Sequence, residues 1–263
     1  MFYWLYDLPN WLVFVLFTVA AVAIGWMFIF ALRRVNARLF GEDREERNGL
    51  VELVLTGTGL FYGLLLGLIA AATYTTYSDT ENSVNSEATS VSALYRDVSN
   101  YPEPTRAQLR KDIEDYVRYV IDEAWPEQQK GEVPLGGRDR VTVLQNHLVA
   151  FEPVTEGDKI LHAEALSQFN SFLVLRQQRI NAVTTSLPAA LWWVLILGAL
   201  INLALISMLA VRKLAAHLVI SGLFAVFVAM MIFLIVSMDN PFRGEFSVQP
   251  DAFVKLQTRL FGT

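Results

Sequence analysis

The chain has 263 residues, of which 54% are hydrophobic and 12% aromatic, a formal net charge of −5 and no cysteine. This composition, with a mean hydropathy of +0.37, excludes an ordinary soluble protein and indicates a membrane protein. The lack of cysteine excludes disulfides, thiol catalysis and thiolate metal sites.

Four apolar runs are long enough to cross a hydrocarbon core of about 30 Å, which takes about 20 helical residues. They cover residues 11–32, 53–73, 189–211 and 214–238. The first run is longer than the apolar core of a signal peptide and follows no basic segment, so we expect it to be retained. The sequence therefore predicts an all-α protein with four transmembrane helices and an extramembrane helical bundle inserted between the second and third spans.

Basic residues gather in the two short loops that join these spans in pairs. The last two spans are joined through Arg212 and Lys213, and the loop between the first two carries Arg33, Arg34, Arg38, Arg44 and Arg47. Because Lys and Arg near membrane ends favour the cytoplasmic side, we expect both loops there. The central segment and both termini are then predicted outside the cytoplasm, for a multi-pass protein of a bacterial inner membrane.

The second span carries a stripe of small residues. Gly59, Gly63, Gly67 and Ala71 recur every four residues and so share one face of a helix. Such a face lets another helix approach closely in a membrane. Small-residue stripes serve contacts within one subunit and between subunits alike, and both interpretations stay open here.

A second stripe of the same span is bulky and consists of Phe61, Leu65 and Ile69. Its simplest interpretation is a face toward lipid or toward the protein core. The alternative is a hydrophobic gate, which closes a pore by dewetting. Charged residues are essentially missing from the four spans, which argues against an ion-coupled transporter, because that class uses intramembrane carboxylates, Lys or His.

The second span is predicted to continue as a helix well beyond the membrane. No proline occurs from Leu50 to Asn100, and apolar residues recur there with steps of four and three. One helix of this length is about 75 Å long at 1.5 Å per residue. We therefore expect the span to be joined mechanically to the central segment.

The central segment, residues 78–187, has 11 basic against 17 acidic residues, a net charge of −6. Such a surface argues against nucleic acid as a partner. After the long helix, apolar periods predict a second helix that stops at Trp125-Pro126 and a short third helix ending near Pro153. A fourth helix is expected from about Asp158 to Pro188, continuous with the third span.

Four segments follow from these expectations: residues 1–77 with two spans, the acidic bundle 78–187, residues 188–238 with the last two spans, and an amphipathic tail 239–263. Phe253, Leu256 and Leu260 form the apolar face of that tail, which we expect to pack back on the bundle.

Polar residues on the two long helices of the bundle are candidates for an interhelical layer, which would fix the register of these helices. They are Asn85, Glu87, Tyr95, Arg176 and Arg179. A solvated helix surface is the commoner role for such residues. His147 and His162 lack the spacing of metal ligands, and no catalytic arrangement is evident, so we expect no metal, no cofactor and no enzyme.

Several stretches together resemble the bestrophin-like family of small bacterial membrane proteins, over about Leu50 to Phe253. These are GLFYGLLLGLIAAATY, NSEATSVSALYRDV, YVIDEAWP, LRQQRINAVTTSLPAALWW and NPFRGEF. Bestrophins proper are pentameric anion channels whose second span lines the pore at a hydrophobic neck. The resemblance implies a homo-oligomer in membrane lipid that passes inorganic ions, with Phe61, Leu65 and Ile69 in the neck role.

Two hypotheses of different class follow. The first is a passive ion channel whose second span lines the pore; its acidic outer segment would concentrate cations, so the sign of the permeant ion stays open. The second is a non-conducting sensor or scaffold whose outer bundle binds an envelope partner and moves the continuous helix.

Overall fold

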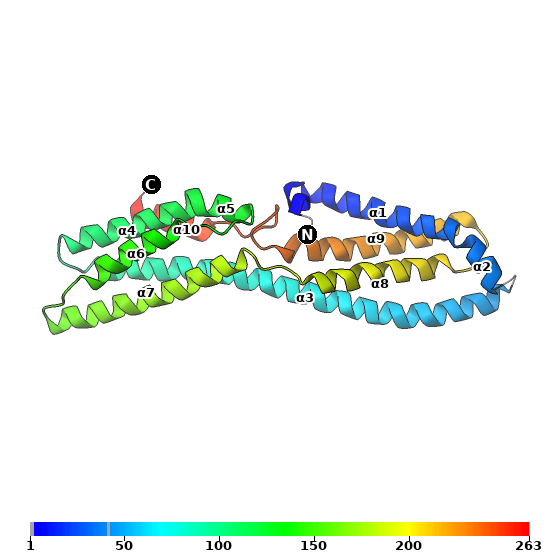
Figure 1. Cartoon of the computed structure of the whole chain (residues 1–263), viewed down its shortest axis with the longest axis horizontal. Coiled ribbons are helices and arrows are strands. Elements are labelled where there is room, and N and C mark those ends of the chain that lie inside the picture. Colours follow the sequence, from blue (N-terminus) through cyan, green and yellow to red (C-terminus); the bar gives the residue numbers. More distant parts are fainter. Residues whose placement is uncertain (1–2, 41–42, 263) are drawn as a thin grey trace. The chain divides into compact units, whose positions relative to one another are not determined.

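The computed structural model in Figure 1 describes residues 3–40 and 43–262. Throughout these residues the secondary structure is helical with no strand, which confirms the all-α prediction. Positions 1, 2, 41, 42 and 263 of the predicted segments lie outside the described residues. The chain divides into two compact units: unit 1 is Met1–Thr75 with Ser186–Asp239, and unit 2 is Thr76–Thr185 with Asn240–Thr263.

Unit 1 contains the four helices that are long and apolar enough to cross a membrane. They are α1 (Asn10–Ala31), the first part of α3 (Arg44–Val98), α8 (Ala189–Ser207) and α9 (Leu214–Asp239), with the short η1 (Tyr3–Asp7) and α2 (Arg33–Phe40). Pro9 and Pro188 directly precede α1 and α8. A proline fixes φ near the helical value and lacks an N–H, so it suits the start of a helix and not its interior.

The spans of unit 1 pack through small residues and a compact apolar core. Gly25 on α1 lies so close to α9 that a Cβ there would be 3.2 Å from the Ser221 hydroxyl oxygen. The core between α3, α8 and α9 consists of Tyr62, Leu66, Ile69, Leu195, Ala199, Val228 and Ile235. Close approach at small residues is how membrane helices gain packing contacts without a hydrophobic driving force between them.

Helix α3 is one continuous helix of 55 residues. The sequence predicts residues 50–100, and the helix instead begins at Arg44 and ends at Val98. Asp43 accepts the backbone N–H groups of Glu45 and Glu46, at 3.0 and 3.1 Å, and so satisfies two donors that a helix start leaves free. The C-terminal end at Val98 agrees with Pro102, because in a continued helix the proline ring would clash with the Val98 carbonyl four residues earlier.

Unit 2 is a helical bundle around the last part of α3. Its other helices are α4 (Thr105–Tyr119), the π-helical turn η2 (Val120–Ala124), α5 (Trp125–Gln129), α6 (Gly137–Val149), α7 (Glu156–Ala182) and α10 (Asp251–Phe261). Its core includes Trp125, Tyr116, Phe169, Phe172, Phe242 and Phe253, all almost fully buried. Tail helix α10 contributes Phe253 and Leu256 to this core.

The predicted stop at Trp125-Pro126 is wrong. Helical structure continues through η2 and α5 to Gln129, with Pro126 in the first turn of α5. A proline inside a regular α-helix removes one hydrogen bond and clashes with the carbonyl four residues earlier. The π turn directly before Pro126 changes the hydrogen-bond register, and the proline then occupies a helix start, where its missing N–H is tolerated.

The predicted continuity of the fourth helix with the third span is also wrong. Helix α7 begins at Glu156, after a capping box in which Thr155 and Asp158 exchange hydrogen bonds. It ends at Ala182, and residues 183–188 are not helical before α8 begins at Ala189. Pro188 accounts for the break, because it disfavours helical backbone at Leu187.

Candidate functional site: the open membrane face of α3

One side of α3 within unit 1 packs on the other spans, and the other side is open. Phe61 and Leu68 are 74% and 71% exposed, and Leu60 and Leu64 are also exposed. These side chains lie on a span that is long and apolar enough to cross a membrane. The open face therefore offers a continuous apolar surface to lipid or to another protein chain.

The predicted glycine stripe lies on or beside this open face. A Cβ at Gly63 or Gly67 would have no neighbouring atom within 4 Å, and at Gly59 it would meet only the Asn202 side-chain oxygen, at 3.7 Å. Ala71 is exposed. At Gly63 and Gly67, accordingly, no other span of the described chain makes the close approach that such a stripe permits.

The three predicted neck residues do not share one environment. Phe61 is exposed, Leu65 is half-buried, and Ile69 is 5% exposed within the core of unit 1. A step of four residues exceeds one helical turn of 3.6 residues, so each such step rotates the side chain by about 40° around the helix axis. Two of these steps from Phe61 carry Ile69 toward α8 and α9. Leu64 and Leu68 are three and seven residues after Phe61, which rotates them in the opposite sense and keeps them on the open side.

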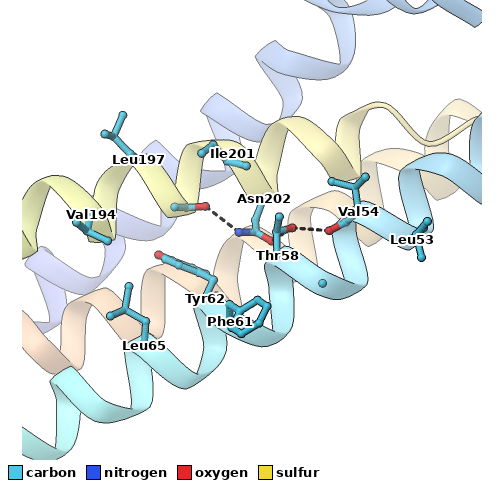
Figure 2. Close-up of a pocket in the computed structure, with 12 residues that line it drawn as sticks. Leu53, Val54, Thr58, Phe61, Tyr62, Leu65, Val194, Leu197, Ile201 and Asn202 are labelled. Atoms are coloured by element: carbon cyan, nitrogen blue, oxygen red, sulfur yellow. Dashed lines mark hydrogen bonds between the residues drawn. The ribbon is translucent and has the colours of Figure 1, made fainter.

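An apolar groove of about 700 Å³ lies between α3 and α8 beside this face (Figure 2). Its lining residues are Leu53, Val54, Gly57, Thr58, Phe61, Tyr62, Leu65, Val194, Leu197, Gly198, Ile201 and Asn202. The volume and the mainly apolar lining with a few polar groups are those of a ligand-sized or helix-receiving groove.

Polar side chains in this groove join α3 to α8. Tyr62 donates its hydroxyl to the Leu195 carbonyl at 3.0 Å, and the Thr58 hydroxyl lies 3.4 Å from Asn202 Oδ1. Asn202 donates to the Gly198 carbonyl at 2.9 Å (Figure 2). Sequence reasoning missed Asn202, although a lone asparagine in an apolar span is a signal of interhelical hydrogen bonding.

Gly198 is required by the same contact. A Cβ at this position would lie 2.5 Å from two carbons of the Tyr62 ring, far inside van der Waals contact. The ring of Tyr62 thus packs directly against the backbone of α8, and its hydroxyl reaches the carbonyl one turn earlier. This contact determines which side of α3 faces α8 and which side stays open.

A second polar arrangement is buried in unit 2 and links three helices. Arg179 of α7 donates from Nε to Glu87 Oε2 of α3 at 2.6 Å and from Nη2 to Glu87 Oε1 at 3.2 Å. The Tyr116 hydroxyl of α4 donates to Glu87 Oε1 at 2.6 Å and accepts from Arg179 Nη2 at 3.2 Å. All three side chains are at most 2% exposed.

Burial and charge shift the pKa values of two members of this cluster, Tyr116 and Arg179. Burial raises the pKa of the Tyr116 phenol beyond its usual range, and the Glu87 carboxylate raises it further. Burial is the largest single effect on Arg179 and lowers its pKa, but the charges and hydrogen bonds of Glu87 and Tyr116 together outweigh it, and the net shift is upward. Tyr116 therefore remains a hydrogen-bond donor and Arg179 a cation over the physiological range.

The other three residues of the predicted polar layer lie elsewhere. Asn85 is exposed and lines a polar groove of about 530 Å³ between α3 and α7, and Arg176 is half-buried beside Gly137. Tyr95 is buried under the Arg110 guanidinium, 4.8 Å from its ring centroid. The sequence did not indicate the role of Tyr116, because its position in an apolar helical period predicts a buried ring and says nothing about the partner of its hydroxyl.

The described residues contain no group of three or more His, Asp or Glu side chains that could hold a metal ion. The fold and the site define an all-helical, multi-span membrane protein in which the outer face of α3 is open, with a second helical unit.

Comparison with known proteins names the class. The family model of the Bestrophin-like domain matches residues 19–253, so the chain belongs to the Bestrophin-like family. A bacterial bestrophin homologue from Klebsiella pneumoniae has the same fold, with a TM-score of 0.69, 13% identity, and coverage of 94% of this chain and 97% of the other.

Two further crystal structures are similar. A single-residue variant of a bestrophin homologue from Klebsiella pneumoniae has a TM-score of 0.68 at 12% identity, covering 95% of this chain and 99% of the other. A structure described as a membrane protein variant has a TM-score of 0.71 at 12% identity, covering 93% and 96%. The search among curated proteins finds no match.

Proposed function

We propose that this protein is a homo-oligomeric ion channel in which the open face of α3 surrounds a central pore. Bestrophin homologues are oligomeric ion channels, and membership of the family supports a channel-like membrane protein. The observation that carries the proposal for this chain is the pair of exposed side chains Phe61 and Leu68 beside Gly63 and Gly67, where an added Cβ would have no neighbour within 4 Å among the described residues.

The geometry of this face suits rotational symmetry. In a ring, each copy of α3 presents the same face to the axis and to its neighbours. Glycines allow neighbouring α3 helices to approach, and bulky apolar side chains one turn apart narrow the space between them. We propose Phe61 as a neck residue together with Leu64 and Leu68; Leu65 borders the groove, and Ile69 would have to leave the core of unit 1 to reach a pore.

The setting of the channel is also a proposal. The arginines between α1 and α3 and the basic pair between α8 and α9 support a cytoplasmic position for these loops. Unit 2, most of which is the acidic segment 78–187, would then lie outside the cytoplasm of a bacterial cell, and its negative charge would raise the cation concentration on that side of the membrane. This supports cations over anions as the permeant species.

The test is ion flux through liposomes that contain the purified full chain. Replacing Leu68 by Ser on the open face should increase flux, because a polar side chain removes the dewetted barrier. Leu223→Ser is the matched control, since Leu223 on α9 is similarly exposed, at 67%. The reversal potential under a salt gradient gives the sign of the ion. Absence of flux from both the unaltered chain and L68S contradicts the channel.

A non-conducting sensor or scaffold is the second candidate. It is favoured by the continuity of α3 from unit 1 into unit 2, where Glu87 ties the same helix to α4 and α7. A signal received by unit 2 could then move a membrane span. Recovery of one envelope protein with the full chain, in the absence of any ion flux, would support this function.

A further inference from the structure

The end of unit 1 formed by α2 and the α8–α9 connection carries a set of exposed cations. We name this set the basic end; it consists of Arg33, Arg34, Arg38, Arg212 and Lys213, all exposed. None of the five forms an ion pair with a carboxylate in the part of the chain that the structure describes. Their charges are therefore available to a partner.

The two halves of the basic end lie at the same level of the bundle. Trp26 of α1 donates its indole N–H to the Leu218 carbonyl of α9 at 3.1 Å. From this bond, Arg33 is seven residues further along α1 and α2, and Leu214 is four residues back toward the start of α9. At 1.5 Å per helical residue, both lie roughly 6 to 10 Å beyond the bond, in the same direction. Figure 1 shows α2 and the α8–α9 connection at one end of unit 1.

Hydrogen bonds to α3 hold the α8–α9 connection in place. Arg47 Nε donates to the Met208 carbonyl at 2.5 Å, and Asn48 Oδ1 accepts the Ala210 N–H at 2.7 Å. His217 Nε2 lies 3.1 Å from the Ile206 carbonyl at the end of α8. Arg212 and Lys213 are thus presented from an anchored turn, at the same end of unit 1 as α2 (Figure 1).

Apolar side chains flank these cations at the boundary of the spans. Val35 on α2 and Leu214 at the start of α9 are 43% and 53% exposed. Asn36, between Arg34 and Arg38 on the short helix, is buried, so α2 turns one face to the protein and its cations to the outside. Exposed apolar groups next to exposed cations match a bilayer surface, where acyl chains lie beneath phosphate groups.

Acidic residues in the same loop reduce the positive charge but do not reverse it. Residues 33–47 and 212–213 contain seven basic and four acidic residues, a net charge of +3. Asp43 also accepts two backbone N–H groups at the start of α3, and Glu45 and Glu46 lie in the first turn of that helix, so these three carboxylates are held at the start of α3. Arg44 lies between these carboxylates in the sequence, and we leave it out of the basic end.

From these contacts we propose that the basic end binds the headgroups of anionic phospholipids in the adjacent leaflet. Guanidinium groups form paired hydrogen bonds with phosphate, and a net negative headgroup such as phosphatidylglycerol adds attraction that a zwitterionic headgroup lacks. Each cation near such a surface strengthens binding by about fivefold. This inference does not depend on whether the protein conducts ions.

The experiment measures which lipid stays bound to the full chain. The protein, purified in a neutral detergent, is exposed to equal amounts of phosphatidylglycerol and phosphatidylcholine, and the bound lipids are counted by native mass spectrometry. We expect phosphatidylglycerol to be enriched at low salt and the enrichment to fall as salt shortens the screening length. Replacing all five basic-end residues by Gln should reduce the enrichment by about tenfold or more.

The matched control removes five exposed cations from unit 2, by replacing Arg96, Lys111, Arg118, Arg138 and Lys255 with Gln. It should keep the enrichment. The pairs R33Q/R34Q and R212Q/K213Q give partial losses, which preserves the test if the fivefold variant does not fold. Equal loss in the unit 2 control, unchanged enrichment in the basic-end variants, or displacement of the lipid by inorganic phosphate at matched ionic strength overturns the proposal.

Discussion

Arg179 and Glu87 lie 2.6 Å apart between Nε and Oε2, and both side chains are almost completely removed from solvent. They come from α7 and α3, which are 92 residues apart at this contact, and Tyr116 of α4 closes the cluster. A buried ion pair gains stability only when its remaining hydrogen-bonding groups are satisfied. Here the Tyr116 hydroxyl supplies an additional partner for both charges. Arg179 Nη1, however, has no hydrogen-bond partner among the described residues, and the guanidinium lies 5.9 Å from the ring centroids of Trp125 and Phe253.

Removal of one charge from this pair should destabilise unit 2 strongly. Arg179→Met leaves the Glu87 carboxylate buried without its cation, and we expect a loss of about 3 to 5 kcal/mol in the free energy of unfolding. The double variant E87M/R179M should lose clearly less than the sum of the two single variants, because neither charge then remains unpaired. Chemical unfolding of the full chain, monitored by tryptophan fluorescence, measures the cycle. Additive losses would contradict a direct pair.

Asp97 should make stability depend on pH in the direction opposite to a paired carboxylate. Burial raises its pKa, and nearby Glu164 raises it further. A raised carboxyl pKa gives stability that is fully present below the unfolded value and is lost as pH rises through the folded value. Asp97→Asn should therefore raise the melting temperature at neutral pH, and its advantage should vanish near pH 4, about the unfolded pKa of Asp.

Glu103 provides the control for that experiment. Its side-chain hydrogen bond with Arg106 lowers its pKa, so its contribution is present above the unfolded value and is lost as pH falls. Glu103→Gln should be neutral or slightly destabilising at neutral pH, with the difference closing in acid. Parallel pH curves for the Asn and Gln variants would show that the Asp97 effect does not arise from its titration.

Gly198 should tolerate no side chain. An added Cβ would lie 2.5 Å from the Tyr62 ring, so Gly198→Ala forces α3 and α8 apart or displaces the ring. Overpacking of this kind costs about 1 to 3 kcal/mol. Thermal unfolding in detergent should show the loss, and Tyr62→Ala in the same chain should relieve part of it. Gly57→Ala, where space is open, is the control; equal losses at the two glycines would refute the packing argument.

Gly67 should matter for assembly and little for the fold of one chain. Among the described residues, no other part of the chain lies within 4 Å of a Cβ built at this position, so we expect Gly67→Leu to be accommodated in the isolated chain. If copies of α3 approach at the glycine stripe, the leucine keeps them apart, and the particle mass from light scattering should fall to that of smaller assemblies. Ala20→Leu, at an exposed small residue of α1, should leave the mass unchanged. An unaltered mass for G67L would place the subunit contact elsewhere.

Local sequence features were enough to predict several parts of this fold. The lengths of the apolar runs predict the four spans, because a helix that crosses the bilayer core needs about 20 apolar residues. The absence of proline between Leu50 and Asn100 gives the long α3, and Pro188 gives the start of α8. These features depend only on a residue and its close neighbours in the chain, so they can be predicted from a single sequence.

Other features depended on partners distant in the chain. Pro126 lies inside helical structure because a π turn precedes it, and that turn has no recognisable sequence signature in this chain. Tyr116 belongs to an apolar period, yet its hydroxyl completes a buried ion pair with residues of two other helices. Hydrophobic periodicity predicts which residues are buried, but it does not predict the hydrogen bonds that their side chains form in the core.

The same division applies to the stripes of the second span. The sequence by itself determined that α3 carries a small-residue stripe and bulky neighbours, because spacing along a helix is enough to place residues on faces. Only the tertiary structure decided which face is open: Tyr62 packs on the bare backbone at Gly198, which turns Ile69 into the core and leaves Phe61 and Leu68 outside. Helical spacing relates residues of one helix to each other, whereas orientation comes from contacts with a second helix.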